Sequence, residues 1–343
     1  MEDMPSRSEL HRDEHRGNSP KGKGPKKGHP VRNTILIIIA VLLVGTGAFA
    51  ARTYFNARKA ANTAFNSSGI KKSRNTSAVL NGKKPVSILL LGTDTGALGR
   101  DYKGRTDTII LATINPKTKT TTLVSLPRDS EVAVSGFEQD FPTKLNVAYA
   151  YGSAGTTITT IQKWLNVPID YYALINMGGM KKVVNEIGGV DITPIRTFTY
   201  EGYHYTKGVK THMNGDKALQ YSRMRYQDPL GDYGRQQRQR QLITAILGES
   251  TSASNLLKQD FLQSLAKQTR TDLTFNNLTS LFSNYRVATK NVVSDHAQGN
   301  GKMISGQSFE VVPQTEKQRV TNVLRKSLDL KAATTGERFA NQN

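Results

Sequence analysis

Short apolar runs separated by turn residues mark the start of the folded part of this chain. Residues 86–91 (VSILLL) form a continuous apolar run, and residues 108–114 (TIILATI) form a second. The sequence Asn-Pro-Lys at 115–117 predicts a turn into a third run at 120–126, so the last two runs are expected to pair as a hairpin. Continuous apolar runs are typical of strands covered on both faces. They predict an α/β fold, a layered α/β/α domain with a central mixed β-sheet flanked by helices.

Helical periodicity alternates with strands farther along the chain. Apolar residues three or four positions apart predict helices over residues 156–165, 177–187, 216–221, 236–247, 255–265, 278–282 and 315–328. Further strands are predicted over residues 171–175, 190–192 and 309–312. Asn214 suits the N-cap of the helix that follows it, because its side-chain oxygen can accept from a free backbone N–H group. This alternation supports the layered arrangement.

An uncharged apolar stretch precedes the folded part. Residues 34–51 are 18 residues without charge, which as a helix would span about 27 Å, just enough for a bilayer core about 30 Å thick. The leader before it carries six basic and no acidic residues between Arg16 and Arg32. Basic flanks stay on the cytoplasmic side. We expect a single-pass protein of the cell membrane with its N-terminus in the cytoplasm, although small residues near the end of the stretch leave signal-peptide cleavage as an alternative.

Composition divides the chain into six segments. We expect a basic disordered cytoplasmic tail over residues 1–33, one transmembrane helix over 34–51 and a polar stalk or linker over 52–84. The main domain is expected over residues 85–250. The segments after it are expected to be an extension of helices and a strand that packs on this domain, 251–330, and a flexible tail, 331–343.

The charge balance points to a polyanionic partner. The chain has 47 Lys plus Arg against 27 Asp plus Glu, a net charge of +20, which suits nucleic acid, anionic lipid, a phosphorylated substrate or a charged cell-wall polymer. The expected location outside the cell argues against nucleic acid. The absence of cysteine excludes disulfides, thiolate metal sites and cysteine nucleophiles. A near match to a phosphate-binding loop at 99–106 is followed by a strand instead of the required helix.

Acidic and basic residues gather at one predicted edge of the sheet. Asp94 follows the first strand and Asp107 opens the second, so both carboxylates can project at the same edge. Carboxylates in such positions commonly bind Mg²⁺ together with phosphate oxygens, although two solvated turn aspartates would give the same pattern. Arg105 lies two residues before Asp107, and Arg128 follows the third strand. The edge therefore combines both signs of charge.

Five arginines lie within 18 residues with only two acids among them: Arg223, Arg225, Arg235, Arg238 and Arg240. On an extended segment, the spacing of two between the first pair points both guanidinium groups to one face. Arg235 and Gln239 form an i, i+4 pair at a helix start, just after Asp232. So many cations would repel one another unless an anion lay between them, and guanidinium groups bind phosphate bidentately. A diphosphate is the natural ligand, and a basic face on anionic lipid is the alternative.

Six stretches in the same order make the chain resemble the LytR-CpsA-Psr family of cell-wall ligases. The matching segments are SILLLGTD (87–94), GRTDTIILATINPKTK (104–119), VSLPRD (124–129), KLNVAYAYG (144–152), INMGGMKKVVNEIGGVDI (175–192) and NGDKALQYSRMRYQDPLGDYGRQQRQRQLI (214–243). Residues 250–330 resemble the C-terminal extension of the LytR-like branch. The loop 99–104 and Ser130-Glu131 depart from the family pattern, so contacts of that loop are not carried over.

The resemblance implies an enzyme that transfers an anionic glycopolymer, such as teichoic acid or capsular polysaccharide, from a polyprenyl-diphosphate carrier to peptidoglycan and releases polyprenyl phosphate. It implies that residues 85–250 are the catalytic domain and that Mg²⁺ or Mn²⁺ assists. Two residues match the metal-associated acids, Asp94 and Asp107. The matching diphosphate-binding arginines are Arg105, Arg128, Arg223 and Arg225. Lys144 matches the nearby basic residue, and the closing cluster corresponds to Asp232, Arg235 and Gln239.

Several expectations follow for the reaction and its partners. Asp232 is the first candidate to orient or deprotonate the acceptor hydroxyl, and Asp107 the second. The expected partners are the lipid-linked glycopolymer, peptidoglycan and the cell membrane, without nucleic acid. The alternative is a non-catalytic, membrane-anchored protein that binds polyanions or regulates in the manner of a transcription attenuator.

Overall fold

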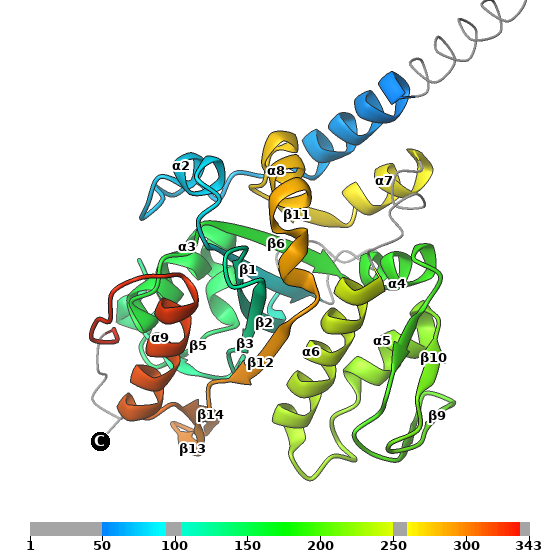
Figure 1. The fold of residues 1–343 in the computed structure, drawn as a ribbon. Helices are drawn as coiled ribbons and strands as arrows, with labels where there is room; N and C mark the ends of the chain where they lie inside the picture. Colours follow the sequence, from blue (N-terminus) through cyan, green and yellow to red (C-terminus); the bar gives the residue numbers. More distant parts are fainter. Residues whose placement is uncertain (1–49, 94–103, 250–258, 337–343) are drawn as a thin grey trace, which may run out of the picture. The chain divides into compact units, whose positions relative to one another are not determined.

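A mixed six-stranded sheet organises the molecule. The computed structural model describes residues 50–93, 104–249 and 259–336. The strands lie in the order β11 (Thr269–Thr271), β6 (Tyr171–Asn176), β1 (Val86–Thr93), β2 (Thr106–Asn115), β3 (Thr120–Ser125) and β12 (Val292–His296) (Figure 1). β1, β2 and β3 are antiparallel neighbours, whereas β6 and β12 run parallel to β1 and β3. The predicted mixed sheet and the β2–β3 hairpin are confirmed.

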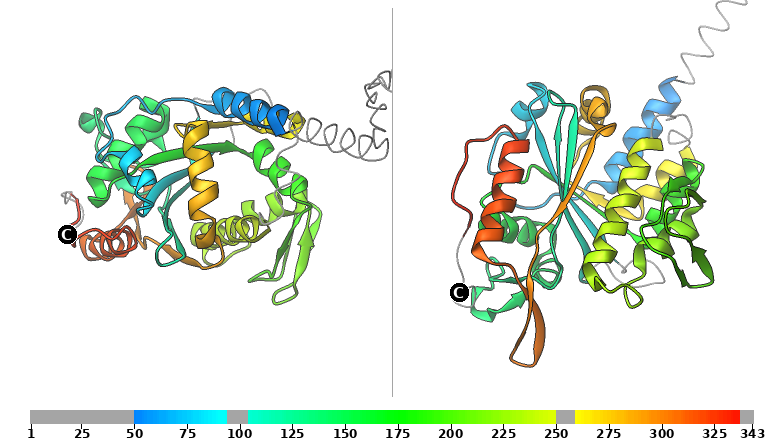
Figure 2. Two further views of the ribbon diagram at one scale, coloured as in Figure 1. Left: turned by 45° about the horizontal axis from the view of Figure 1, so that its top comes forward. Right: turned by 60° about the horizontal axis from the view of Figure 1, so that its bottom comes forward.

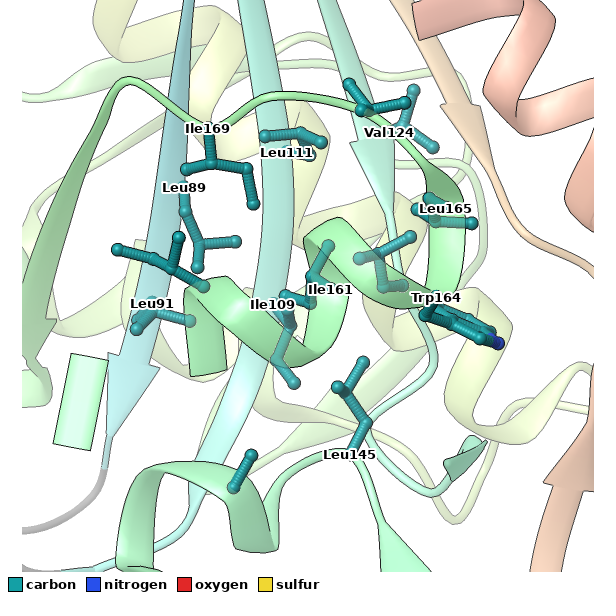
Figure 3. Packing of buried hydrophobic residues seen from close by; sticks show 14 of the residues in the cluster. Leu89, Leu91, Ile109, Leu111, Val124, Leu145, Ile161, Trp164, Leu165 and Ile169 are labelled. Atoms are coloured by element: carbon teal, nitrogen blue, oxygen red, sulfur yellow. The ribbon is translucent and has the colours of Figure 1, made fainter. Parts of the chain in front are cut away.

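Helices cover both faces of the sheet, which explains why the central strands read as continuous apolar runs. On one face, Leu89 and Leu91 of β1 belong to the same buried cluster as Ile161 and Trp164 of α3 (Val147–Leu165), part of which Figure 3 shows. The same face carries α9 (Gln314–Ser327). The opposite face is covered by α2 (Thr76–Asn81), α6 (Gly231–Glu249) and α8 (Phe275–Tyr285). The predicted α/β/α layering is therefore observed (Figure 2).

A smaller lobe packs beside the sheet around its own core. It contains α4 (Met177–Glu186), β7 (Val190–Ile192), β8 (Phe198–Tyr200), β9 (Tyr203–Tyr205), β10 (Thr211–Met213) and α5 (Gly215–Arg223). Tyr205 and Tyr221 meet in its centre with ring centroids 5.3 Å apart. As predicted, Asn214 caps α5, where its side chain accepts from the N–H group of Lys217. Leu242 of α6 joins this core, so α6 connects the lobe to the sheet.

Short elements complete the fold. These are β4 (Glu131–Val132), η1 (Glu138–Asp140), β5 (Thr143–Lys144), α7 (Gln259–Ala266), η3 (Arg286–Thr289), β13 (Asn300–Ile304) and β14 (Gln307–Val311). β4 pairs with β5, and β13 and β14 form a hairpin that projects away from the sheet in Figure 2.

The segments around the main domain are tied to it. The predicted linker 52–84, which was expected to contain a helical stretch, is helical over residues 50–64, and its later part contacts the domain, because Asn66 donates to the Thr271 carbonyl and Arg74 pairs with the buried Asp170. The extension after residue 250, which was expected to pack on the domain, supplies β11 and β12 to the main sheet and so completes that sheet. The start of the predicted flexible tail is also ordered, since Thr335 is buried and bonded to Thr321.

In the parts of the chain that the structure describes, none of the helices combines the length and the apolar content that crossing a bilayer requires. The predicted transmembrane stretch 34–51 lies outside those parts except for its last two residues, and the predicted cytoplasmic tail 1–33 lies outside them entirely.

Candidate active site

The site forms at the edge where β2 begins and β3 ends. Antiparallel pairing of β2 with β3 brings Asp107, the second residue of β2, beside Arg128 in the loop after β3. Arg128 Nη1 donates to Asp107 Oδ1, and the two side chains are 19% and 33% exposed. Although burial disfavours the cation, Asp107, Asp129 and Asp232 raise the pKa of Arg128. As predicted, an acidic and a basic side chain, those of Asp107 and Arg128, lie together at this edge of the sheet.

The first turn of α6 supplies the second pair. Arg235 Nη2 lies 2.6 Å from Asp232 Oδ1 and donates to the Asp107 carbonyl at 3.2 Å. Arg128 Nε lies 3.8 Å from Asp232 Oδ1. Burial, together with the nearby charges of Arg128 and Arg225, lowers the pKa of Arg235 despite its pairing with Asp232. Residues from β2, the β3 loop and α6 therefore meet at one point, as the resemblance implied.

Asp129 and Lys144 extend the cluster on the other side of Arg128. Lys144 Nζ lies 3.3 Å from Asp129 Oδ1, and Arg128 Nε lies 3.4 Å from Asp129 Oδ2. The loop is fixed by its backbone, because the N–H group of Asn146 donates to the Arg128 carbonyl at 2.9 Å. Asp129 was not predicted as a site residue, although it stands beside Arg128 in the PRD sequence.

Two buried guanidinium nitrogens in this cluster lack a hydrogen bond, although one of them, Arg128 Nε, lies 3.4 Å from Asp129 Oδ2. Arg128 Nε and Arg235 Nε are buried and form no hydrogen bond within the described part of the chain. A buried donor without a partner loses the free energy of its hydration, so such groups normally face a ligand or water. Both guanidinium groups approach Asp232 Oδ1, and guanidinium donors that meet in this way fit the oxygens of a phosphoryl group.

Arg223 and Arg225 do not share one extended face. α5 continues through Arg223, and the backbone becomes extended only at Met224, so the predicted extended segment is wrong at its first arginine. Arg223 is exposed, with its Nη1 3.5 Å from Gln220 Oε1, and forms no ion pair with a described carboxylate. Arg225 lies over the ring of Tyr226 at 4.5 Å, and its charge acts on Arg235. The described contacts therefore connect Arg225, and not Arg223, to the cluster.

Two of the five neighbouring arginines serve the fold. Arg238 is fully buried, 2.5 Å from Asp228 Oδ2, and donates to the Met224 carbonyl. Arg240 donates to Ser125 and Ser294, which fastens α6 to β3 and β12. The expectation that all five arginines surround one anion is wrong for these two, because their guanidinium groups bind buried partners within the protein, although Arg238 Nε itself forms no hydrogen bond with the described residues.

The remaining predicted residues are less constrained. Arg105 is exposed just before β2, and its carbonyl accepts from Thr93 Oγ1 at 3.2 Å. Gln239 is half-buried on α6, one turn after Arg235. Asp94 lies outside the described residues, so the predicted metal pair with Asp107 stays a prediction. Among the described residues, no group of three His, Asp or Glu side chains is placed to hold a metal ion.

Sequence reasoning also missed contacts from the C-terminal hairpin. Glu310 of β14 donates its N–H group to the Asp129 carbonyl at 2.9 Å, and its side chain meets Tyr233 of α6. Nothing in the local pattern around Glu310 predicts a contact with a residue so distant in the chain.

Comparison with known proteins gives a consistent family match. The model of the LytR_cpsA_psr family matches residues 51–326. A relative from Enterococcus faecalis, the polyisoprenyl-teichoic acid–peptidoglycan teichoic acid transferase TagU, is 40% identical over 306 residues, which cover 89% of this chain and 99% of the relative.

Solved structures resemble the fold as well. Bacillus subtilis TagV matches with a TM-score of 0.62 and 32% identity, over 73% of this chain and 99% of TagV. A structure of TagT bound to LIIa-WTA matches with a TM-score of 0.63 and 27% identity, over 76% of this chain and 98% of TagT. The α/β architecture described above is thus shared with these proteins.

Proposed function

Because this chain belongs to the LytR-CpsA-Psr family, we propose that it is a phosphotransferase that moves an anionic glycopolymer from a polyprenyl-diphosphate carrier to peptidoglycan and releases polyprenyl phosphate. The relative from Enterococcus faecalis is named for the same type of transfer. The observation that carries the proposal is the convergence of two guanidinium groups on one carboxylate oxygen, since Arg235 Nη2 lies 2.6 Å and Arg128 Nε 3.8 Å from Asp232 Oδ1, beside the pair of Arg128 with Asp107. A teichoic acid or a capsular polysaccharide is the expected polymer.

The cluster suits a diphosphate. The side chain of Arg128 is half-buried, and that of Arg235 is buried. Asp129 contacts both Arg128 and Lys144, so Lys144 belongs to the same cluster. Phosphoryl transfer depends mainly on positioning and on stabilising the charge of the oxygens around phosphorus. Charged donors are most effective when they are fixed before the substrate arrives, and the contacts with Asp107 and Asp232 fix these arginines. Arg225 would close the site from the end of α5, with Arg105, Arg223 and Gln239 as further binding residues.

The reaction exchanges one phosphorus–oxygen bond for another. The oxygen of a peptidoglycan hydroxyl attacks the phosphorus that carries the glycopolymer, the bond from that phosphorus to the bridging oxygen breaks, and polyprenyl phosphate leaves. The hydroxyl proton passes to a base. Asp232 is the first candidate for that role and Asp107 the second. Asp232 Oδ1 lies 2.6 Å from Arg235 Nη2, and Oδ2 accepts from Gln236 at 2.9 Å, so the carboxylate is held in place while each oxygen keeps a lone pair that can accept the proton.

A divalent cation, Mg²⁺ or Mn²⁺, is part of the proposal. Asp107 and Asp94 would hold it. Mg²⁺ usually binds through one or two carboxylates, with waters and substrate phosphate oxygens as its other ligands. Asp107 fits this donor set, because its side chain is partly exposed and only Oδ1 is bonded to Arg128. The cation would neutralise charge on the diphosphate.

We also propose that residues 34–51 cross the cell membrane once, with the N-terminus in the cytoplasm and the catalytic domain outside. The charge distribution of the leader supports this orientation. Helix 50–64, which follows, exposes Tyr54 and Phe55, and aromatic side chains favour the membrane interface. The catalytic domain would then meet both peptidoglycan and the lipid-linked donor. Protease treatment of intact cells should degrade the domain and spare the leader, and survival of residues 86–330 would contradict the orientation.

An in vitro transfer assay tests the proposed function. Full-length protein would be given synthetic lipid-diphosphate donors that carry different glycans, together with peptidoglycan oligomers as acceptors. We expect transfer with release of lipid phosphate for at least one anionic glycan. The variant Asp94→Ala should lose transfer and retain binding of the polymer. Binding without turnover in the wild-type protein would instead favour a non-catalytic polyanion-binding or regulatory protein.

A further inference from the structure

The hairpin β13–β14 reaches the site from the C-terminal part of the chain. The N–H group of Glu310 donates to the Asp129 carbonyl at 2.9 Å, and a parallel bridge joins Ser130 to Glu310. Asp129 and Ser130 belong to the loop that carries Arg128. The backbone of Glu310 therefore supports the loop that positions a diphosphate-binding arginine.

The side chain of the same residue supports the opposite side of the site. Glu310 Oε2 accepts from Tyr233 Oη at 3.1 Å, and Tyr233 Oη accepts from the Gly299 N–H group at 2.7 Å. Tyr233 lies in the first turn of α6, directly after Asp232. The backbone of Glu310 thus contacts the Arg128 loop, and the side chain of Glu310 contacts the helix turn that carries Asp232. Glu310 connects these two parts of the site.

Glycine at position 299 leaves room for the carboxyl group of Glu310. A Cβ atom at Gly299 would lie 2.8 Å from Glu310 Oε2, so a larger residue there would crowd this contact. Burial, and then the charges of Asp232 and Asp129, raise the pKa of Glu310, while the bond from Tyr233 opposes this shift. Glu310 forms no ion pair with a described cation, in contrast to Asp107, Asp129 and Asp232.

We propose that Glu310 and Tyr233 form a positioning pair for the transfer reaction. The pair holds the first turn of α6 against the Arg128 loop and so sets the distance between Arg128 Nε and Asp232 Oδ1, which is 3.8 Å here. That distance determines where the transferred phosphoryl group and the acceptor lie relative to the guanidinium groups. The inference rests on the proposed function, and it gives the C-terminal extension a part in the reaction.

The proposal predicts which chemical feature of Glu310 is required. Tyr233 needs a hydrogen-bond acceptor at this position, and an amide oxygen provides one as well as a carboxylate. Glu310→Gln should therefore act nearly as wild type, whereas Glu310→Ala and Tyr233→Phe should both impair transfer. Because the two residues act through the same contact, the double variant should be little worse than either single variant.

Loss of the contact between Glu310 and Tyr233 should lower kcat more than it changes KM. A displacement of about 1 Å in a reacting geometry can cost on the order of 100-fold in rate. The pair does not bind substrate, and several other cations share the binding of the donor, so KM should change less than kcat.

The test measures kcat and KM of the full-length protein and its variants with a synthetic lipid-diphosphate donor, together with thermal unfolding. Met303→Ala, a change at an exposed position of the same hairpin, is the matched control. We expect kcat to fall about 10-fold or more in Glu310→Ala and Tyr233→Phe, with Glu310→Gln and Met303→Ala close to wild type.

Other outcomes would overturn the inference. Loss of kcat in Glu310→Gln equal to that in Glu310→Ala would show that the carboxylate itself is needed. Unchanged kcat with only a lower melting temperature would show a purely structural contact. If wild-type protein fails to turn over, the proposed function fails and this inference with it, whereas an active wild type with an equally active Glu310→Ala refutes the positioning pair alone.

Discussion

Arg128 and Asp107 form an ion pair at the open end of the β2–β3 hairpin, 21 positions apart in the chain. The carboxylate holds Nη1 of the guanidinium group and leaves Nε directed into the cluster without a hydrogen bond. Burying an unpaired cation would be costly, and the acid offsets part of that cost while no substrate is present. The pairing therefore keeps a phosphate-binding group charged and fixed in a half-buried place.

Replacing Arg128 tests this arrangement. We expect Arg128→Ala to reduce transfer by about 10²- to 10³-fold, the usual cost of removing one donor that stabilises transition-state charge. Arg128→Lys should restore only part of the activity, because an ammonium group keeps the charge and loses the planar fork. Lys117→Ala removes an exposed cation at the opposite end of β2 and serves as the control. Equal rates for Arg128→Ala and Lys117→Ala would contradict the role.

Arg223 and Arg225 should be required for activity and unimportant for stability. Both side chains lie at least partly in solvent at the end of α5. Changes at such positions usually alter the free energy of unfolding by no more than about 0.5 kcal/mol. We expect Arg223→Ala and Arg225→Ala to lose transfer while the melting temperature stays near that of wild type. Wild-type turnover of a lipid-diphosphate donor by either variant would refute its role.

Arg238, in contrast, should be important for the stability of the fold. Arg238→Ala leaves the buried Asp228 without its main partner, which typically destabilises a fold by about 3–5 kcal/mol. Arg196 reaches the same carboxylate at 3.0 Å from a side chain that is 38% exposed, so Arg196→Ala is the matched control and should cost about 1 kcal/mol or less. Denaturant unfolding measures both. Similar losses for the two variants would contradict the assignment of Arg238 to the fold.

The same ion pair predicts a dependence of stability on pH. Burial alone would raise the pKa of Asp228, but hydrogen bonds from Arg238 and the Leu230 N–H group outweigh it and lower that pKa. A carboxyl with a lowered pKa in the folded state stabilises the fold above its unfolded pKa of about 3.9, and this contribution is lost as the pH falls through the folded value. Stability should therefore decline below about pH 4. Asp228→Asn should weaken this decline. The measurement is the free energy of unfolding in urea at several pH values between 2 and 5, and the same dependence on pH in the variant and the wild type would contradict the prediction.

The central strands were predictable because their apolar runs reflect burial on both faces. The strands at the two edges of the sheet, β11 and β12, could not be predicted in this way. β11 and β12 are short, and β12 contains the polar residues Ser294, Asp295 and His296, so no periodicity marks them. Their places are set by pairing with β6 and β3, which are far away in the sequence. The helix start at Gly231 was also missed, because the charged first turns of α6 hide its apolar face.

Part of the site could be read from strand ends and helix starts. Asp107 and Arg128 meet because two neighbouring antiparallel strands place them at one edge, a relationship that local patterns do reveal. Local patterns do not distinguish Arg235 from Arg238, since both are arginines on one helix and differ only in what surrounds them. The contribution of Glu310 depends on tertiary structure alone.

Removing the divalent cation should stop transfer if Asp94 and Asp107 hold it. Chelation should abolish turnover, and added Mg²⁺ or Mn²⁺ should restore it, because the cation neutralises charge that the arginines alone do not balance. Asp107→Asn should raise the metal concentration for half-maximal rate by at least about 10-fold, since even losing an outer-shell partner costs 10- to 100-fold in affinity. Binding of Mn²⁺ followed by electron paramagnetic resonance should weaken in parallel, independently of activity. Asp216→Asn, which changes an exposed acid paired with Lys181, is the control. Full activity after chelation would remove the cation from the mechanism and leave the charge of the diphosphate to Arg128, Arg235 and their neighbours.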